Sequence, residues 1–458
     1  MNVSPAVWSV LQVLGKQGVS YFAFLILSYT LEPKHFGVLA MAMAWVGFIN
    51  VFAEIGFGAA IIQKDEIHNG HLNTTFLVNV AIGLVLLLIG IGLSRVAAWF
   101  FNTPEVQPVL AVLSFGFFIN ALSLTQVAYL QRNMQFKKLA IRDLIASILG
   151  GFTAVLLALN DFGVWSLVAQ SMTVYAVSSI LIWCYSSWKP GVKDVSILYI
   201  KELWPFSSKI FQFNIFKYFA QNTDLLVVGY LLDSTVLGYY TFAFRMVVFP
   251  FTTLVGAIGI YLFSKFSRMQ TDVLSVKDHF LQLLKKINSV VCPPLILLAF
   301  WAHAYIPMIF GERWHPALEI FPVMALVAFL QSNISPIGNI MKALNKPDWL
   351  LKWSILIAGM VGLSMSFGAR FGLYGVAFSL FLSYTIGLFI NYFILHKLVA
   401  FSWADCMNLS KFVIVPILVI YALIVGGKMV FDIYPLSVFL LFLLGIPGIF
   451  FVNYLVRK

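Results

Sequence analysis

Long apolar stretches recur along the whole chain, and they constrain its fold more than any other feature. Each runs for about 20 residues, the length that a helix needs to cross the hydrocarbon core of a bilayer. Hydrophobic residues make up 61% of the 458 positions and charged residues only 10%, whereas about a quarter of a soluble domain is charged. The loops are too short for a soluble catalytic domain. The sequence therefore predicts an all-α integral membrane protein whose function lies within its helix bundle.

Charged, proline and glycine clusters divide the chain into about 14 predicted spans, with 13 or 12 as alternatives. Most of the 29 Lys and Arg residues then fall on the side that holds both termini, which predicts cytoplasmic ends. The predicted spans are 6–30, 36–62, 74–100, 107–130, 139–160, 163–186, 206–231, 236–262, 283–310, 317–341, 350–369, 373–396, 411–430 and 434–455. The opposite side carries only Lys34, Arg95, Arg313, Arg370 and Lys428.

The net charge of +11 would favour nucleic acid as a partner if the protein were soluble. Here the positive charge gathers in the loops of one side, so it indicates topology instead. The cysteines Cys184, Cys292 and Cys406 lie apart, without the CxxC spacing of a metal or redox site. We therefore expect no nucleic-acid partner, no metal and no cofactor.

Matching segments indicate an internal repeat. "LSYTLEPKHFGVL" (27–39) aligns with "VGYLLDSTVLGYY" (228–240) at an offset of 201 positions, and Asn133 aligns with Asn345 at an offset of 212. Because six spans preserve sidedness, the copies are predicted to be two parallel six-helix lobes. We expect a first lobe over 1–188, a cytoplasmic amphipathic linker over 189–205, a second lobe over 206–398, and two further spans over 399–458.

Charged side chains within the spans form the candidate site. A charge at bilayer depth costs about 2.5–3.5 kcal/mol on insertion scales, so such residues usually face protein or a wet cavity. Lys16 lies in "VLQVLGKQGVSYFAFLIL" (10–27), and the offset of 201 carries it onto Lys217. At about 100° per residue, Gln12 and Lys16 share one helix face. Polar stripes on equivalent spans predict a hydrated cavity between the lobes. On the seventh span the stripe is Asn214, Lys217, Gln221 and Asp224.

Two interpretations of these charges are open. In one, Lys16 pairs with Glu54, and Arg245 on the eighth span pairs with Asp224, as structural ion pairs. In the other, three cations against two carboxylates leave one positive charge for an anionic ligand such as a phosphate. Glu54 and Asp224 are also candidate proton or sodium sites. Gln331 on the tenth span is a candidate sugar contact, and interhelical hydrogen bonding explains it equally well.

Two segments resemble a known family. These are "LEPKHFGVLAMAMAWVGFINVFAEIGFGAAIIQKD" (31–65) and "LGYYTFAFRMVVFP" (237–250). They are similar to bacterial polysaccharide transporters, the Wzx-type lipid-linked oligosaccharide flippases of the multidrug/oligosaccharidyl-lipid/polysaccharide exporter superfamily. The resemblance implies a V-shaped bundle of two six-helix lobes around a central cavity, plus two C-terminal helices. It also implies export of undecaprenyl-pyrophosphate-linked repeat units across the bacterial inner membrane, for exopolysaccharide, capsule or O-antigen synthesis.

Relatives that flip the peptidoglycan lipid precursor use cavity cations on spans equivalent to the first, second and eighth. Lys16 and Arg245 fit that pattern, whereas Glu54 departs from it. We therefore expect an alternating-access flippase without enzyme activity. Its pyrophosphate ligands would be Lys16, Lys217 and Arg245, and its sugar contacts Gln12, Asn214, Gln221 and Gln331.

The expected partners are the lipid-linked substrate and membrane lipid, with polysaccharide polymerase and export machinery as further candidates. Two other functions stay open. One is a multidrug or small-cation antiporter of the same superfamily, which would favour an acidic cavity. The other is a scaffold for the polymerase that transports nothing.

Overall fold

The computed structural model describes residues 5–405, apart from Glu54, Val192, Gln270, Thr271, Ala400, Trp403 and Ala404. In this part of the chain every regular element is a helix, which confirms the all-α class. The chain divides into two compact units, Met1–Gly238 and Tyr239–Lys458, called here the first and second units. The predicted lobe boundary lies earlier, at the 189–205 linker, and the predicted lobe limits stay a prediction.

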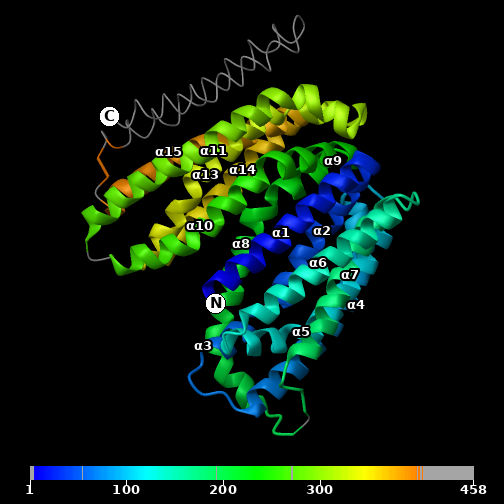
Figure 1. Cartoon of the computed structure of the whole chain (residues 1–458), viewed down its shortest axis with the longest axis vertical. Coiled ribbons are helices and arrows are strands. Elements are labelled where there is room, and N and C mark those ends of the chain that lie inside the picture. The colour runs from blue at the N-terminus through cyan, green and yellow to red at the C-terminus, as the bar shows by residue number, and fades with distance from the viewer. Residues whose placement is uncertain are drawn as a thin grey trace, which may run out of the picture. The chain divides into compact units, whose positions relative to one another are not determined.

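The described helices carry the labels of Figure 1. The first unit contains α1 (Pro5–Thr30), α2 (Pro33–Ala53), α3 (Phe57–Gln63), α4 (Asn69–Phe100), α5 (Val106–Arg132), α6 (Phe136–Ala158), α7 (Val164–Tyr185) and α8 (Ile197–Leu231). The second unit contains a π-helix, η1 (Phe244–Val248), and then α10 (Phe249–Arg268), α11 (Val273–Phe310), η2 (Glu312–Trp314), α12 (His315–Leu318), α13 (Phe321–Ala343), α14 (Pro347–Gly368), η3 (Ala369–Phe371) and α15 (Gly372–Val399). Between them, α9 (Ser234–Ala243) crosses the boundary of the units.

The first twelve predicted spans each fall on one of these helices or on a consecutive set of them. Within the described residues, nine helical stretches are long and apolar enough to cross a membrane, and one of them, Asp348–Val399, contains both α14 and α15. The protein is therefore a multi-pass membrane protein. The predicted spans 411–430 and 434–455 lie outside the described residues.

Small residues let the helices of the first unit pack closely. A Cβ atom on Gly83 of α4 would overlap the side chain of Ala121 in α5, and Gly151 of α6 faces Ala23 of α1. Helix association in a membrane depends on such close van der Waals packing, because lipid tails are as apolar as the helices themselves. Accordingly, α1, α6 and α7 lie side by side (Figure 1).

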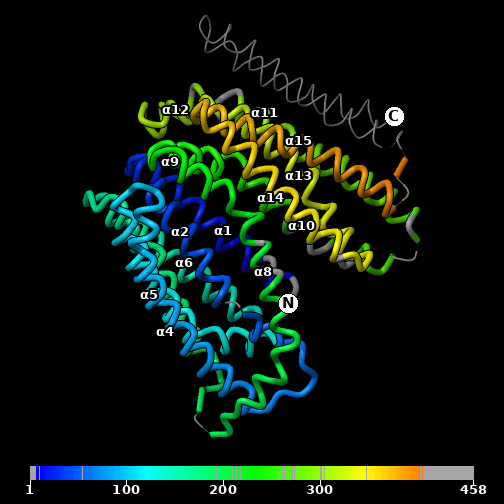
Figure 2. The backbone as a smooth tube through the Cα atoms, turned by 180° about the vertical axis from the view of Figure 1, so that it is seen from behind, coloured from blue at the N-terminus to red at the C-terminus, as the bar shows by residue number. Residues whose placement is uncertain are grey.

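The second unit is built around α13, which contacts α10, α11, α14 and α15 (Figure 2). Most of its side chains are buried. At one end of the unit the indole of Trp314 is fully buried and stacks on the ring of Phe242, with centroids 4.0 Å apart. Burial of large aromatic rings is among the strongest contributions to packing.

Two helices are longer than the membrane is thick. The 35 residues of α8 and the 38 of α11 correspond to roughly 50–57 Å at 1.5 Å per residue, against about 30 Å of hydrocarbon. The sequence predicts the segment before residue 206 as a separate amphipathic linker. The structure instead joins residues 197–205 to the predicted span 206–231 in one helix.

The two copies of the repeated motif meet where α2 and α9 begin. A Cβ atom on Gly37 would collide with the carbonyl oxygen of Ser234, and a Cβ atom on Gly238 would collide with that of Pro33. The offset of 201 relates Pro33 to Ser234 and Gly37 to Gly238, so the contact is reciprocal, as it is between symmetry-related copies. This reciprocity supports the alignment of the repeat.

Candidate functional site

The polar stripe of α1 is anchored to α6 by a carboxylate. Gln12 Nε2 donates a 2.6 Å hydrogen bond to Asp143 Oδ2. Arg142 pairs with the other oxygen, with Nη2 at 2.6 Å and Nε at 2.8 Å from Oδ1. The side chains of Arg142 and Asp143 are only 12% and 9% exposed. A buried charge needs such partners, so this cluster fixes the position of α1 against α6.

Lys16 is exposed and lies one helical turn beyond Gln12. At about 100° per residue it lies roughly 120–140° around the helix from Leu11 and Phe22, which are 49% and 68% exposed. It lies within about 20° of the directions of Ala23 and Leu27, and both of these are buried. Lys16 therefore lies on the face of α1 that is buried at Ala23 and Leu27, away from the exposed apolar face.

The second predicted stripe lies on α8, with spacings that put its members on one face. Asn214 and Asp224 are half-buried and Gln221 is exposed. Lys217 lies on the same helix, but its side chain is outside the described part of the structure. The first unit thus holds predicted site residues on two helices, α1 and α8.

The remaining predicted residues lie in the second unit. Arg245 is exposed and is the second residue of the π-helix η1, whereas Met246, Val247 and Val248 of the same segment are buried. Pro250 explains the local geometry, because it has no N–H to donate to the carbonyl of residue 246 and its ring displaces that carbonyl. Short π-helical segments often occur at functional sites.

Gln331 lies half-buried on α13. Glu54 is outside the described residues, so its predicted pairing with Lys16 stays a prediction. The predicted pairing of Arg245 with Asp224 would join the two units and also stays a prediction.

Asp143 is not among the residues that the sequence predicts for the site, although it lies inside the predicted span 139–160. An acid within an apolar span was the signal that could have found it. The second copy of the repeat carries Ser354 and Ile355 at the equivalent positions, so this cluster belongs to the first copy alone.

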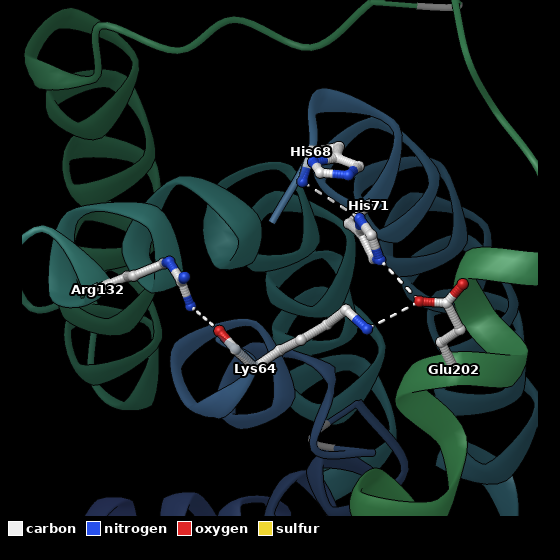
Figure 3. Close-up of polar contacts among 5 residues, drawn as sticks. All are labelled: Lys64, His68, His71, Arg132 and Glu202. Atoms are coloured by element: carbon white, nitrogen blue, oxygen red, sulfur yellow. Dashed lines mark hydrogen bonds and ion pairs between the residues drawn. The ribbon is translucent and has the colours of Figure 1, made fainter. Parts of the chain in front are cut away.

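A second polar cluster lies in the same unit (Figure 3). Glu202 Oε2 lies 2.8 Å from Lys64 Nζ and 3.1 Å from His71 Nε2. The His68 backbone N–H donates to His71 Nδ1, so the proton of a neutral ring lies on Nε2 and points to Glu202. The His71 ring is buried and lies 4.3 Å from that of Tyr199. The hydrogen bonds from Lys64 and His71 lower the pKa of the Glu202 carboxyl.

Arg132 binds the end of α3 beside this cluster (Figure 3). Its guanidinium donates to the carbonyl oxygens of Ile61 at 2.8 Å and Asp65 at 2.7 Å, and it also contacts the carbonyl of Lys64. A cation at the C-terminus of a helix satisfies carbonyls that have no partner within the helix. Several basic residues that were predicted to share one membrane side therefore lie at one end of the first unit.

The first turns of α4 fasten the loop between α7 and α8 to this end. Asn73 Nδ2 donates to the carbonyl of Lys193 at 2.9 Å, and its Oδ1 accepts from the N–H of Gly191 at 3.0 Å. The N–H of Ser196 donates to Thr74 Oγ1 at 3.1 Å. The loop and the start of α8 are therefore part of the packed unit.

The described helices, several of them long and apolar enough to cross a membrane, define a multi-pass membrane protein with charged residues within its spans. The structure is similar to that of the lipid II flippase MurJ in an inward closed conformation, with a TM-score of 0.69 over 93% of this chain and 98% of that one, at 14% identity. It is also similar to an inward-facing multidrug transporter of the MATE family, with a TM-score of 0.65 over 86% of this chain and 98% of that one, at 12% identity. At these identities the similarity concerns the fold alone.

Residues 26–319 match the family described as "Polysaccharide biosynthesis protein", and the chain belongs to that family. It is 24% identical to the lipopolysaccharide biosynthesis protein WzxC of Escherichia coli over 86% of this chain and 81% of WzxC. It is 27% identical to the succinoglycan biosynthesis transport protein ExoT of Rhizobium meliloti over 79% of this chain and 73% of ExoT. The teichuronic acid biosynthesis protein TuaB of Bacillus subtilis is 24% identical, over 69% of this chain and 66% of TuaB.

Proposed function

We propose that this protein is a flippase. It moves undecaprenyl-pyrophosphate-linked oligosaccharide repeat units from the cytoplasmic to the periplasmic leaflet of the bacterial inner membrane by alternating access. The observation that carries the proposal is the family match over residues 26–319. The relatives named for lipopolysaccharide biosynthesis and succinoglycan transport support a surface polysaccharide as the end product. No covalent step is part of this function, and we predict no enzyme activity.

The proposed head-group ligands are Lys16, Lys217 and Arg245, because Lys and Arg bind phosphate oxygens by point-charge or forked contacts. The position of Lys16, away from the exposed apolar side of α1, supports its part in this set. An exposed Arg245 on a π-helical segment also suits a ligand contact.

The proposed sugar contacts are Gln12, Asn214, Gln221 and Gln331. Gln12 Nε2 is held by Asp143, which leaves its Oε1 atom to accept from a sugar hydroxyl. In this proposal Arg142 and Asp143 position Gln12 and do not touch the substrate. Asp224 and Glu54 are proposed either as ion-coupling groups or as structural partners of the cations.

The proposed orientation places both termini in the cytoplasm. It rests on the basic residues Lys64, Arg132 and Lys138, which lie at one end of the first unit and bind loop or helix-end carbonyls or carboxylates there. Cytoplasmic loops are enriched in Lys and Arg. Polysaccharide polymerase and export proteins are the proposed partners.

The test is deletion of the gene in its own host, followed by assay of the lipid-linked repeat units. We expect these units to accumulate on the cytoplasmic leaflet, and the wild-type gene to restore export. A Lys16→Ala gene, expressed at the wild-type level, should restore little. The matched control Lys346→Ala changes an exposed lysine of the loop before α14 and should restore export fully.

Three outcomes would contradict the proposal. Absence of accumulation after deletion excludes flipping of this substrate. Normal surface polysaccharide together with lost transport of a lipophilic cation indicates a multidrug antiporter. Full export with Lys16→Ala and with Arg245→Ala indicates that these cations take no part in transport, as expected of a scaffold.

A further inference from the structure

A groove of about 760 Å³ lies within the first unit, where the turns between α1 and α2, α4 and α5, and α8 and α9 come together. Its size falls in the range of roughly 300–1,000 Å³ that ligand clefts have. The side chains that matter for recognition are Lys34, Asn102, Glu105, Tyr230 and Asp233. None of the residues proposed to bind the head group lines it.

The groove and the Glu202 cluster lie at opposite ends of α8. Tyr230 follows Glu202 by 28 positions, which is roughly 42 Å along a helix and exceeds the hydrocarbon thickness of about 30 Å. The end that holds Glu202 also holds the basic loops, so the groove is on the side with few cations. In the proposed orientation that side is the periplasm.

One wall of the groove is the ring of Tyr230, which packs against a second aromatic ring. Tyr230 is 57% exposed, and its ring lies 4.6 Å from that of Phe100, at an interplanar angle of 31°. Phe100 belongs to α4, so the ring is supported by a different helix from the one that carries it. An exposed tyrosine backed in this way offers a flat apolar surface with a polar rim.

The polar groups of the groove are mixed in charge. Lys34 Nζ lies 2.5 Å from Glu105 Oε1, and their side chains are 45% and 48% exposed. Asp233 Oδ1 accepts the N–H of Val236 at 2.8 Å, which leaves Oδ2 as a further acceptor. Two carboxylates and only one ammonium group make the groove unfavourable for an anion such as a phosphate. The number of polar groups also makes it unfavourable for a lipid chain, which would leave them without hydrogen-bond partners.

Sugars match this combination. The C–H faces of a pyranose pack on an aromatic ring, and its hydroxyls donate to carboxylates and accept from ammonium and amide groups. We propose that this groove binds neutral sugar residues of the glycan on the periplasmic side, after the repeat unit has crossed the membrane. The inference rests on the proposed function, since that function supplies both the glycan and the orientation.

The test measures binding of a free sugar to the purified full-length chain in detergent micelles. The probe is the repeat-unit oligosaccharide prepared by depolymerising the surface polysaccharide of the host, so it carries neither lipid nor pyrophosphate. Ligand-detected NMR gives the dissociation constant. We expect the wild-type protein to bind, and Tyr230→Ala to bind at least about tenfold more weakly, because truncation of an aromatic anchor usually costs that much.

Two variants separate lost contact from lost folding. Tyr230→Phe keeps the ring and should bind nearly as well as wild type. Tyr29 aligns with Tyr230 in the repeat; it is 63% exposed and does not line the groove. Tyr29→Ala should therefore leave binding unchanged. Equal binding by Tyr230→Ala and wild type, or equal losses in Tyr230→Ala and Tyr29→Ala, would overturn the proposal.

The result is also separable from the test of the flippase. If deletion causes lipid-linked units to accumulate but the wild-type chain does not bind the free oligosaccharide, the groove proposal alone fails. If deletion causes no accumulation, the proposed function fails, and binding at Tyr230 no longer supports a role in export.

Discussion

Asp143 shows how one buried carboxylate organises the candidate site. It accepts from Gln12 on α1 and from Arg142 on its own helix, and so uses both of its oxygens. The polar stripe that carries Lys16 is thereby fixed against α6, because Gln12 lies one turn away from that lysine. The stripe is a local property of α1, whereas its position depends on a residue 131 positions later.

Replacing Asp143 by alanine should destabilise the protein strongly. The change leaves Arg142 buried without its carboxylate, and breaking a buried ion pair from one side costs roughly 3–5 kcal/mol. The double variant Arg142→Ala with Asp143→Ala should lose less than Asp143→Ala alone, since no charge is then left unpaired. Thermal unfolding of the purified protein in detergent measures both.

The control for this prediction is Glu66→Ala, which removes an exposed acid in the loop before α4 and should leave the melting temperature unchanged. A double variant that is less stable than Asp143→Ala would contradict the assignment, because it would mean that Arg142 stabilises the fold without its partner.

The sequence predicts the stripes but not their partners. Helical spacing alone places Gln12 with Lys16, and Asn214 with Gln221, because side chains three or four positions apart share a helix face. The bond from Gln12 to Asp143 follows from the packing of α1 on α6, and no periodicity in either segment encodes which helices are neighbours. Lys16 could be singled out because a charge in an apolar span is costly. Asp143 carries the same signal, but it lies beside Arg142, close to the start of its predicted span.

At the scale of elements, α8 differs most from its prediction. Amphipathic spacing before residue 206 predicts a surface helix, and the apolar run after it predicts a span. The structure joins the two parts across Pro205, which lies near the start of the helix. Side chains of α4 and the ion pair from Glu202 to Lys64 hold its first turns. These are tertiary contacts between segments far apart in the sequence, so the sequence pattern of either part of α8 cannot show them.

The stabilising effect of Glu202 should depend on pH. Its pKa is lowered in the folded protein by Lys64 and His71, so its contribution is fully present above the unfolded value of about 4.3 and is lost as the pH falls through the folded value. Glu202→Gln should therefore lower the melting temperature at pH 7, and the difference from wild type should shrink below about pH 4.

The same measurement on Glu66→Gln provides the comparison, because Glu66 is an exposed acid of the loop between α3 and α4. It should show no difference from wild type at either pH. If the difference in melting temperature between Glu202→Gln and wild type stays constant from pH 7 to below pH 4, the carboxylate charge is not what stabilises the contact.

At the scale of the whole molecule, hydropathy predicts the order of the long helices in the described part of the chain, because each arises from a local apolar run. The repeat is predicted from only a few matching positions. The contact at Gly37 and Gly238 now supports it independently, since residues related by the offset of 201 meet reciprocally. A matching pattern of residues cannot show that the two motifs touch, because the contact depends on how α2 and α9 pack.

Alanine at Gly37 or at Gly238 should destabilise the protein by a similar amount. Each added methyl group would meet a backbone carbonyl, which cannot rotate away as a flexible side chain can, and overpacking of this kind costs roughly 1–3 kcal/mol.

Gly92→Ala is the matched control, because nothing lies within 4 Å of its added methyl group, and alanine is the better helix former by roughly 0.5–1 kcal/mol. Thermal unfolding in detergent should therefore rank Gly92→Ala at or above wild type and the other two variants together below it. A large difference between Gly37→Ala and Gly238→Ala in melting temperature would mean that the two motifs do not share the stabilising contact equally. The reciprocal repeat would then be wrong.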